Sequence, residues 1–222
     1  MRKFYEIFSD VKLYPLGTKL CWSHYKELLV VRDIDATRYY IDICYRANLS
    51  KRELQEKIKR HEYERLSDEA KIKLIKNNKL KVDDLIPNPI IIKVNNIDKE
   101  LTEYALKQAI LNKLDEFLLQ LGNGFSYIGN EYKIKLGSVY NYIDLLLFNY
   151  EYNSFVVIEL KVTELKKEHI GQIQVYMNYI DKNLKKFNQE DTIGIIICKK
   201  DNKYVIEYCS DDRIISRRYE LV

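Results

Sequence analysis

The alternation of apolar and polar positions between Tyr140 and Lys161 predicts a β-hairpin. Two runs rich in Val, Ile, Leu, Phe and Tyr are each too short for a membrane-spanning helix, and polar residues 150–153 separate them. In the second run the strand period of two places Glu159 and Lys161 on one face. Asp144 is the only charge within the first run. An unpaired carboxylate there would be costly to bury, so the hairpin carries charges that need a partner.

The chain before the hairpin follows a helical period. Apolar residues recur at steps of three and four over residues 18–29 and again over residues 33–47, which predicts two core-facing helices. Ser50 and Glu53 form a capping box that predicts the start of another helix. A further helix is expected over residues 67–77. The first part of the chain is therefore expected to be helical.

Two successive helices joined by a short turn are what a helix-turn-helix requires. On the second helix Leu54 and Ile58 would pack inward. The residues that project outward are candidates for contact with a nucleic-acid groove or with phosphates: Lys51, Arg52, Gln55 and Lys59. Any solvated helix has a similar polar face, and this alternative stays open. Trp22 is interpreted as a core residue rather than as a platform for stacking bases.

A change of pattern near residue 90 predicts a domain boundary. Pro87 and Pro89 interrupt helical continuation, and residues 90–94 could add an edge strand. Residues 95–98 are the expected hinge. We therefore expect two domains, a helical DNA-binding domain and a second domain with the hairpin: residues 1–95 and residues 96–222.

The second domain is expected to alternate helices and strands. The predicted elements are, in order, a long helix over residues 98–121, a strand over 127–136, the hairpin, a helix over 166–184, a buried strand over 192–198 and a last strand over 204–208.

Length and composition narrow the class of protein. A chain of 222 residues can bury a core, and it has neither a run of about eighteen apolar residues nor a signal-peptide pattern. We therefore expect a cytoplasmic protein without a membrane partner. The four cysteines are far apart and form no Cys-x-x-Cys pair, so reduced thiols are expected rather than a zinc site.

The net charge of +4 is unevenly distributed. Residues 1–95 hold 20 Lys and Arg against 14 Asp and Glu, a net charge of +6, whereas residues 96–222 hold 17 against 19, a net charge of −2. The basic half is the better candidate for holding a phosphate backbone. The alternative, that lysine usage reflects the base composition of the source genome, stays open.

A hard divalent cation is the economical partner for Asp144 and Glu159, because Mg²⁺ prefers one or two carboxylates together with waters and phosphate oxygens. Lys161 beside these carboxylates could then orient or deprotonate a water. It could also neutralise the charge that grows on a phosphate in its transition state.

Asp144 on one strand and Glu159-Leu160-Lys161 on the next resemble the PD-(D/E)XK nuclease superfamily. The resemblance narrows to the YhcG family of these nucleases, and the stretches that carry it are residues 122–129, 142–148, 155–161 and 171–181. Residues 22–33 and 50–66 are similar to that family's amino-terminal domain. Relatives commonly have more chain before this block, so we expect a shortened amino-terminal domain.

The resemblance implies an α/β (α+β) fold, a restriction-endonuclease-like αβββαβ core with a mixed central sheet, preceded by a small helix-turn-helix-like domain. It implies a metal-dependent endonuclease that hydrolyses DNA in repair, recombination, restriction or mobile-element biology. Asp144, Glu159 and the main-chain carbonyl of Leu160 would hold Mg²⁺, for which Mn²⁺ would substitute. Lys161 would position the water or stabilise the transition state, and no small-molecule cofactor is expected.

Two other functions stay open, a DNA-binding protein on a nuclease scaffold and an RNA-directed nuclease or toxin of the same fold. Cutting both strands with one site per chain suggests a homodimer, although sequential nicking needs none.

The helix after the hairpin offers further site residues. Gln172 and Tyr176 lie on one flank of its apolar face and Gln174 lies on the other, so only one glutamine can face the site. The Gln-x-x-x-Tyr spacing resembles a branch of these nucleases in which the glutamine borders the metal and the tyrosine supports the site. We therefore favour Gln172, with Gln174 in reserve.

The superfamily often adds a carboxylate from the first helix of the core. Glu116 is the nearest inward candidate and Glu103 is the other. Related sequences place acidic residues where this chain has Lys107, Gln108 and Gln120. They usually have an arginine and a glutamine where this chain has Gly129-Asn130-Glu131. Glu131 is expected on a polar strand face, where it could be merely solvated.

Overall fold

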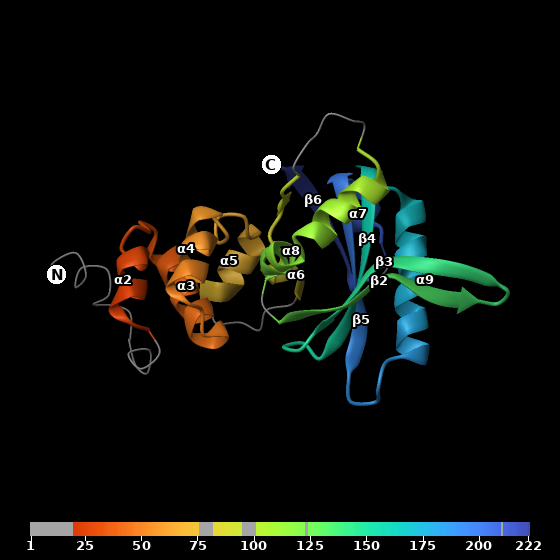
Figure 1. The fold of residues 1–222 in the computed structure, drawn as a ribbon, viewed down its shortest axis with the longest axis horizontal. Coiled ribbons are helices and arrows are strands. Elements are labelled where there is room, and N and C mark those ends of the chain that lie inside the picture. Colours follow the sequence, from red (N-terminus) through yellow and green to blue (C-terminus); the bar gives the residue numbers. More distant parts are fainter. Residues whose placement is uncertain (1–19, 76–81, 95–100, 123, 210) are drawn as a thin grey trace. The chain divides into compact units, whose positions relative to one another are not determined.

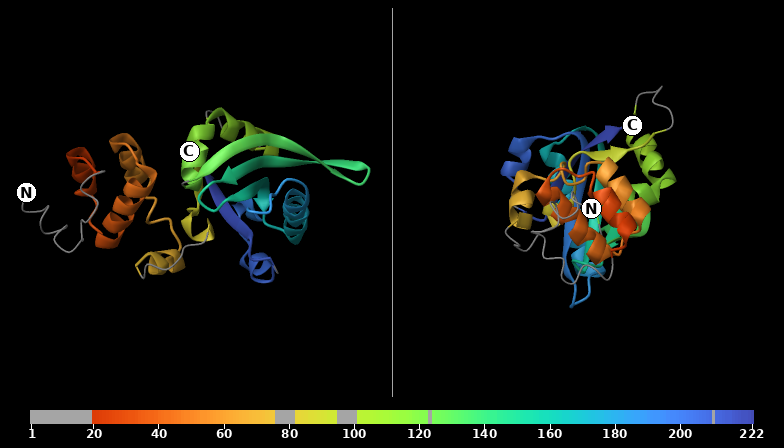
Figure 2. Two further views of the ribbon diagram at one scale, coloured as in Figure 1. Left: turned by 90° about the horizontal axis from the view of Figure 1, so that it is seen from below. Right: turned by 90° about the vertical axis from the view of Figure 1, so that its left-hand side faces the viewer.

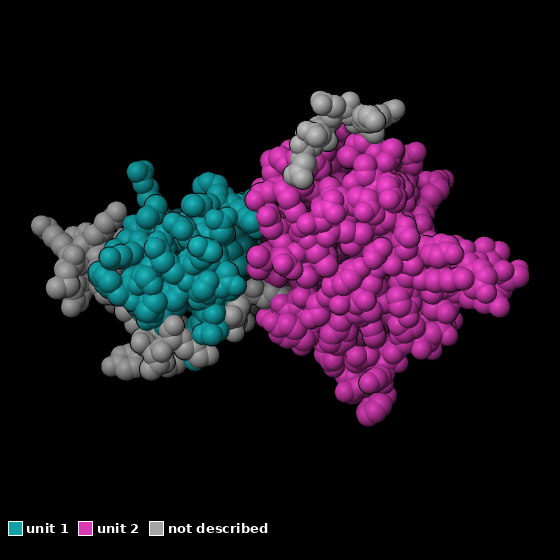
Figure 3. Space-filling model, viewed as in Figure 1, with its two compact units in different colours: residues 1–84 teal, residues 85–222 magenta. Residues whose placement is uncertain are grey.

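The computed structural model describes residues 20–75, 82–94, 101–122, 124–209 and 211–222. The chain divides into two compact units, residues 1–84 and residues 85–222 (Figure 3). The division precedes the predicted boundary at residue 95 because Ile90–Ile92 form strand β1 of the second unit. The predicted hinge, residues 95–98, lies outside the described residues. Within the described ranges no helix has both the length and the apolar character needed to cross a membrane.

The first unit is built from helices, as predicted (Figure 1). They are α2 Trp22–Leu28, α3 Ile34–Ala47, α4 Lys51–Lys59, α5 Asp68–Ile75 and, at the boundary, α6 Val82–Leu85. The Asp33 side chain caps α3, and the predicted capping box of Ser50 and Glu53 begins α4. Leu54 is fully buried and Ile58 is partly buried, so α4 packs with the predicted face inward.

The prediction that Trp22 belongs to the core is wrong, because the residue is 53% exposed. The buried face of the seven-residue helix α2 consists of His24, Tyr25 and Leu28. Trp22 lies on the flank of that face, about 60° from Tyr25 and farther from Leu28 at 100° per residue.

The second unit contains a mixed sheet, as predicted, and its six strands have the order β1-β6-β5-β4-β3-β2. The longer strands are β2 Phe125–Leu136, β3 Val139–Asn149, β4 Ser154–Glu164, β5 Glu190–Lys200 and β6 Ile214–Leu221. Strands β2, β3 and β4 pair antiparallel, whereas β4, β5, β6 and β1 pair parallel. The predicted hairpin is confirmed as β3 and β4.

Helix α9, Lys167–Asn183, connects the parallel neighbours β4 and β5 and packs on the sheet (Figure 1). Its buried side chains include Ile173 and Met177. A Cβ atom at Gly194 of β5 would lie 2.5 Å from the Met177 sulfur and 3.0 Å from Ile173 Cδ1. The absence of a side chain at Gly194 therefore lets α9 pack closely against β5.

Two predicted elements differ in the structure. The helix expected over residues 98–121 is divided into α7 Glu103–Asn112 and α8 Leu114–Leu121, because the backbone of Lys113 leaves the helical region. The last strand, expected over residues 204–208, is helix α10 Lys203–Glu207. The Asn202 side chain accepts a hydrogen bond from the Val205 N–H and caps this helix, and β6 supplies the strand instead.

Candidate active site

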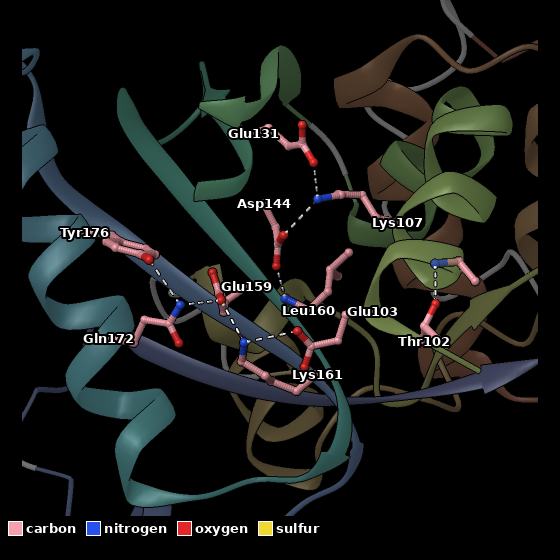
Figure 4. Close-up of polar contacts among 11 residues, drawn as sticks. Thr102, Glu103, Lys107, Glu131, Asp144, Glu159, Leu160, Lys161, Gln172 and Tyr176 are labelled. Atoms are coloured by element: carbon pink, nitrogen blue, oxygen red, sulfur yellow. Dashed lines mark hydrogen bonds and ion pairs between the residues drawn. The ribbon is translucent and has the colours of Figure 1, made fainter. Parts of the chain in front are cut away.

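Strands β3 and β4 separate where the charged residues lie. Their ladder ends at the pair Leu145–Ile158. Beyond that pair, the N–H of Leu160 donates to Oδ2 of Asp144 (3.0 Å). A buried N–H needs an acceptor, and here a side chain from β3 replaces the missing backbone partner. The acidic residue within the apolar β3 run is therefore held across the gap between the strands (Figure 4).

Glu159 on β4 is almost fully buried, with 3% of the residue exposed. Its Oε1 accepts hydrogen bonds from Lys161 Nζ (2.8 Å) and Gln172 Nε2 (2.7 Å). Its Oε2 is buried with no hydrogen-bond partner among the described residues. Burial, and secondarily the negative charge of Asp144, raise the pKa of Glu159 to about 7.

These properties fit a divalent cation. A cation beside Oε2 would give this oxygen a partner and would offset the repulsion between Glu159 and Asp144. The described residues contain no group of three or more His, Cys, Asp and Glu side chains that could hold a metal. Two carboxylates are nevertheless a common protein contribution to a Mg²⁺ site, in which waters and substrate phosphates supply the other ligands.

Lys161 is buried beside Glu159 and also lies 3.6 Å from Oε2 of Glu103 on α7. Burial alone would lower the pKa of the Lys161 ammonium, but the charge of Glu159 and its hydrogen bond, with Glu103 and Asp144, outweigh burial and raise it. The lysine is therefore held as a cation between carboxylates.

Helix α9 brings Gln172 rather than Gln174 to the site. Besides its bond to Glu159, the Gln172 amide nitrogen lies 3.1 Å from the Tyr176 hydroxyl (Figure 4). Gln174 lies on the opposite flank, near Asp211, whose pKa is lowered mainly by Arg213 and to a smaller extent by Gln174. The structure thus brings Asp144, Glu159, Lys161, Gln172 and Tyr176 together.

Lys107 was not predicted as a site residue, yet it lies at the site. Its ammonium contacts Oε1 of Glu131 (2.8 Å) and Oδ1 of Asp144 (3.4 Å). Glu103 and Lys107 are four residues apart on α7 and therefore share one face of that helix. This spacing was the sequence signal for their common direction. Glu131, for which simple solvation was left open, has a side chain that is 54% exposed and also pairs with Lys107.

Comparison with known proteins identifies the family. Residues 83–220 match the sequence model of the YhcG PDDEXK nuclease domain, and residues 1–65 match that of the DUF1016 N-terminal domain. The chain belongs to the YhcG nuclease family. The resemblance seen in the sequence is thereby confirmed.

One relative is the YhcG protein of Escherichia coli (strain K12), which is 25% identical over 195 residues. The match covers 85% of this chain and 51% of that protein, so the chain spans about half the length of its relative.

Two solved structures are similar over part of the chain. A repair endonuclease from Pyrococcus abyssi matches 56% of this chain and 50% of its own, with a TM-score of 0.39 and 16% identity. An EndoMS–dsDNA2 complex matches 57% of this chain and 49% of its own, with a TM-score of 0.40 and 16% identity.

The two carboxylates considered on the first helix of the YhcG core lie in different environments. Glu103 on α7 contacts Lys161, whereas Glu116 on α8 forms an ion pair with Lys93 (2.9 Å). The break at Lys113 separates α7 from α8. Because Glu103 contacts Lys161, it is a better candidate than Glu116 for the additional carboxylate expected from the first helix of the core.

The candidate nucleic-acid residues of the DUF1016 unit lie on α4. Lys51, Arg52 and Lys59 are exposed and Gln55 is half-buried. Lys51 pairs with Glu27 (3.3 Å) and Lys59 approaches Glu56 (3.9 Å). Contact of this face with nucleic acid stays a prediction.

Proposed function

We propose that the chain is a metal-dependent endonuclease that hydrolyses phosphodiester bonds of DNA. The observation that carries the proposal is Oε2 of Glu159, which is buried and has no hydrogen-bond partner among the described residues. It belongs to a carboxylate that lies near Asp144 and accepts a hydrogen bond from the Lys161 ammonium. The proposal is that a cation binds at Oε2 of Glu159, where it would also contact a phosphate of the substrate.

Asp144, Glu159 and the main-chain carbonyl of Leu160 would hold Mg²⁺ or Mn²⁺. Such an ion, when bound, supplies Lewis-acid polarisation of the scissile phosphate. The chain's own contribution is to keep both carboxylates in place, Asp144 through the Leu160 N–H and Glu159 through Gln172.

In this proposal Lys161, whose ammonium contacts Glu159 and Glu103, would donate hydrogen bonds to a phosphate oxygen or to the attacking water. In the proposed reaction, a water oxygen bonds to phosphorus while the bond from phosphorus to one sugar oxygen breaks. One proton leaves the water and one proton reaches the departing sugar oxygen, which gives a phosphate monoester and an alcohol. The Lys161 ammonium stabilises the charge that develops on the phosphate.

The experiment is a cleavage assay with the full chain, using Mg²⁺, Mn²⁺ or chelator and labelled single-stranded, duplex and branched DNA. Metal-dependent cleavage of DNA is expected. RNA of matched sequence is included, and cleavage of RNA alone would replace the DNA assignment. Cleavage that persists in chelator would contradict the metal requirement.

A second candidate function, nucleic-acid binding without hydrolysis, is favoured by Lys107, whose ammonium contacts Asp144. If Lys107 blocks the metal, Lys107→Ala should bind Mn²⁺ in calorimetry whereas the unmodified chain does not. The nuclease proposal instead expects the unmodified chain to bind Mn²⁺, and Lys107→Ala to bind it with equal or higher affinity.

We also propose that cutting both strands at one position takes two copies of the chain, because the proposed metal ligands form one site per chain. Light scattering with branched DNA present should give a mass of two chains. A single chain that cuts both strands by successive nicks would contradict the dimer.

A further inference from the structure

Strands β2 and β3 form a two-stranded ribbon beyond the last pair that joins β3 to β4. We call residues 131–144 the ribbon; it extends away from the rest of the sheet (Figures 1 and 2). One face packs on the core, since Ile134 and Ile143 are fully buried. The register places Lys133 opposite Tyr142 and Lys135 opposite Tyr140 on the other face, the outer face.

The outer face combines positive charge with exposed aromatic rings. Tyr140 and Tyr142 are 51% and 52% exposed. The Lys133 ammonium lies 3.9 Å from the centroid of the Tyr140 ring, and that of Lys135 lies 5.8 Å from it. Both lysines therefore form cation–π contacts with Tyr140, and the positive charge lies beside this ring. Surfaces that bind single-stranded nucleic acid use the same combination, in which cations attract phosphates and rings stack on unpaired bases.

The outer face leads to the candidate active site. Along β3 the period of two places Tyr140, Tyr142 and Asp144 in one row. Along β2 the neighbouring row ends at Glu131, and Lys107 contacts both Glu131 and Asp144. From Tyr140 to Asp144 the row spans roughly 13 Å of extended strand. A nucleic-acid strand lying on this face would therefore reach the carboxylates.

We propose that the outer face of the ribbon binds a single-stranded segment of the substrate and leads it to Asp144. This inference rests on the proposed function and specifies its substrate: a nucleic acid with unpaired bases beside the cut, such as a fork or a branch. In a continuous duplex the bases are stacked on each other, so their faces are not available to the tyrosines.

The test is binding of the full chain to a labelled oligothymidylate and to a duplex of equal length, measured by fluorescence anisotropy in chelator. Replacing both rings, Tyr140→Ala with Tyr142→Ala, should weaken binding of the single strand by roughly thirtyfold, at about fivefold per stacked base. Binding of the duplex should change by less than about threefold. Tyr140→Phe with Tyr142→Phe keeps the rings and should restore binding.

A matched control removes an exposed lysine and ring elsewhere in the same unit. Lys186 and Phe187 are exposed in the segment that precedes β5. Glu190, where β5 begins, lies six residues before Ile196, the partner of Glu159, or roughly 20 Å along the strand. Lys186→Ala with Phe187→Ala should leave both affinities unchanged.

The lysines are tested through salt dependence. For single strands each phosphate contact contributes about 0.7 to the slope of log affinity against log salt concentration. Lys133→Ala with Lys135→Ala should therefore lower this slope by about 1.4, whereas the tyrosine variants should leave it unchanged.

Three results would overturn the inference. The tyrosine-to-alanine variant could bind the single strand as well as the unmodified chain does, or the control variant could lose as much affinity as the tyrosine variant. The tyrosine variant could also lose self-association while it still binds the oligonucleotide. The last result would make the outer face an interface between copies. Because binding is measured in chelator, it is independent of hydrolysis. If the ribbon variants lose single-strand binding but the unmodified chain never cleaves nucleic acid, only the proposed function is contradicted. If the unmodified chain cleaves and the ribbon variants bind normally, only this inference is contradicted.

Discussion

Each unit of the chain buries a lysine against a glutamate, and the two pairs differ in one respect. In the helical unit Lys57 Nζ donates to both oxygens of Glu62 (3.0 and 2.8 Å), and the Tyr39 hydroxyl donates to Oε1 of the same carboxylate (2.8 Å). Both oxygens of Glu62 therefore have partners, and the cluster joins α3 to α4 and to the residues that follow α4.

In the sheet unit Lys161 and Gln172 both donate to Oε1 of Glu159, while Oε2 stays buried and without a partner among the described residues. A second carboxylate, Asp144, adds its repulsion, and the pKa of Glu159 is raised to about 7. We infer that the helical pair, in which both carboxylate oxygens are satisfied, has a structural role. In the sheet pair, Oε2 of Glu159 has no partner among the described residues and is the position that we propose for a cation.

Of the variants that distinguish the Lys161–Glu159 pair from the Lys57–Glu62 pair, Lys161→Ala is expected to have the largest effect. Loss of the ammonium should lower the single-turnover cleavage rate by about a thousandfold or more, because it removes charge stabilisation of the transition state. The melting temperature should change little, since Glu159 can take up a proton or a metal. Full activity in this variant would exclude Lys161 from the reaction.

Lys57→Ala should have the opposite profile. Removal of the ammonium leaves the buried Glu62 carboxylate without its cation, which should destabilise the helical unit by at least about 3 kcal/mol. Urea unfolding followed by circular dichroism measures this loss. The cleavage rate per folded chain should stay within about twofold for a short duplex or fork; a thousandfold loss would remove the distinction between the pairs.

A smaller effect is expected in the pH dependence of stability without metal. The raised pKa means that folded Glu159 keeps its proton between pH 4.5 and about 7, where the unfolded carboxyl has lost it. The folded state then binds more protons, so the free energy of unfolding should fall across this window, by on the order of 2 kcal/mol, and stay level above it. Urea unfolding in chelator at pH 5 and pH 8 measures the change. Glu159→Gln should lack this part of the dependence, and an identical dependence in both proteins would contradict the assigned pKa.

The smallest effect is expected from the glutamines of α9. Gln172→Ala removes one hydrogen bond to Glu159 and should lower the cleavage rate by about tenfold, as losses around a metal ligand commonly do. Gln174→Ala, on the other flank, is the matched control and should change the rate by less than about twofold. Equal effects in both variants would indicate that the helix, not the hydrogen bond to Glu159, is what matters.

Much of the site could be predicted because its parts are local. The period of two in β4 places Glu159 beside Lys161, a short hairpin brings Asp144 opposite them, and the helical period selects the flank of α9 that carries Gln172. In each of these inferences the residues that are brought together lie fewer than about twenty positions apart in the sequence. The pattern of apolar positions also predicted the order of the elements from the first helix of the core to β5, in agreement with the family resemblance.

The parts that could not be predicted depend on tertiary packing. Lys107 reaches Asp144 only because α7 packs beside β4, which no local pattern records. The break at Lys113 has no Gly or Pro nearby to mark it, so the sequence did not indicate that Glu103 and Glu116 lie on separate helices. Residues 204–208 form too short a run to distinguish strand from helix, and the cap at Asn202 decides it.

The central claim is that Glu159 keeps one buried oxygen for a cation that it shares with Asp144. The most direct measurement is calorimetric titration of the full chain with Mn²⁺ at pH 7.5, compared with Glu159→Gln and Lys161→Ala. We predict one Mn²⁺ per chain, binding weakened by about tenfold or more in Glu159→Gln, and binding retained in Lys161→Ala. Equal Mn²⁺ affinity in the Glu159→Gln variant would contradict the account.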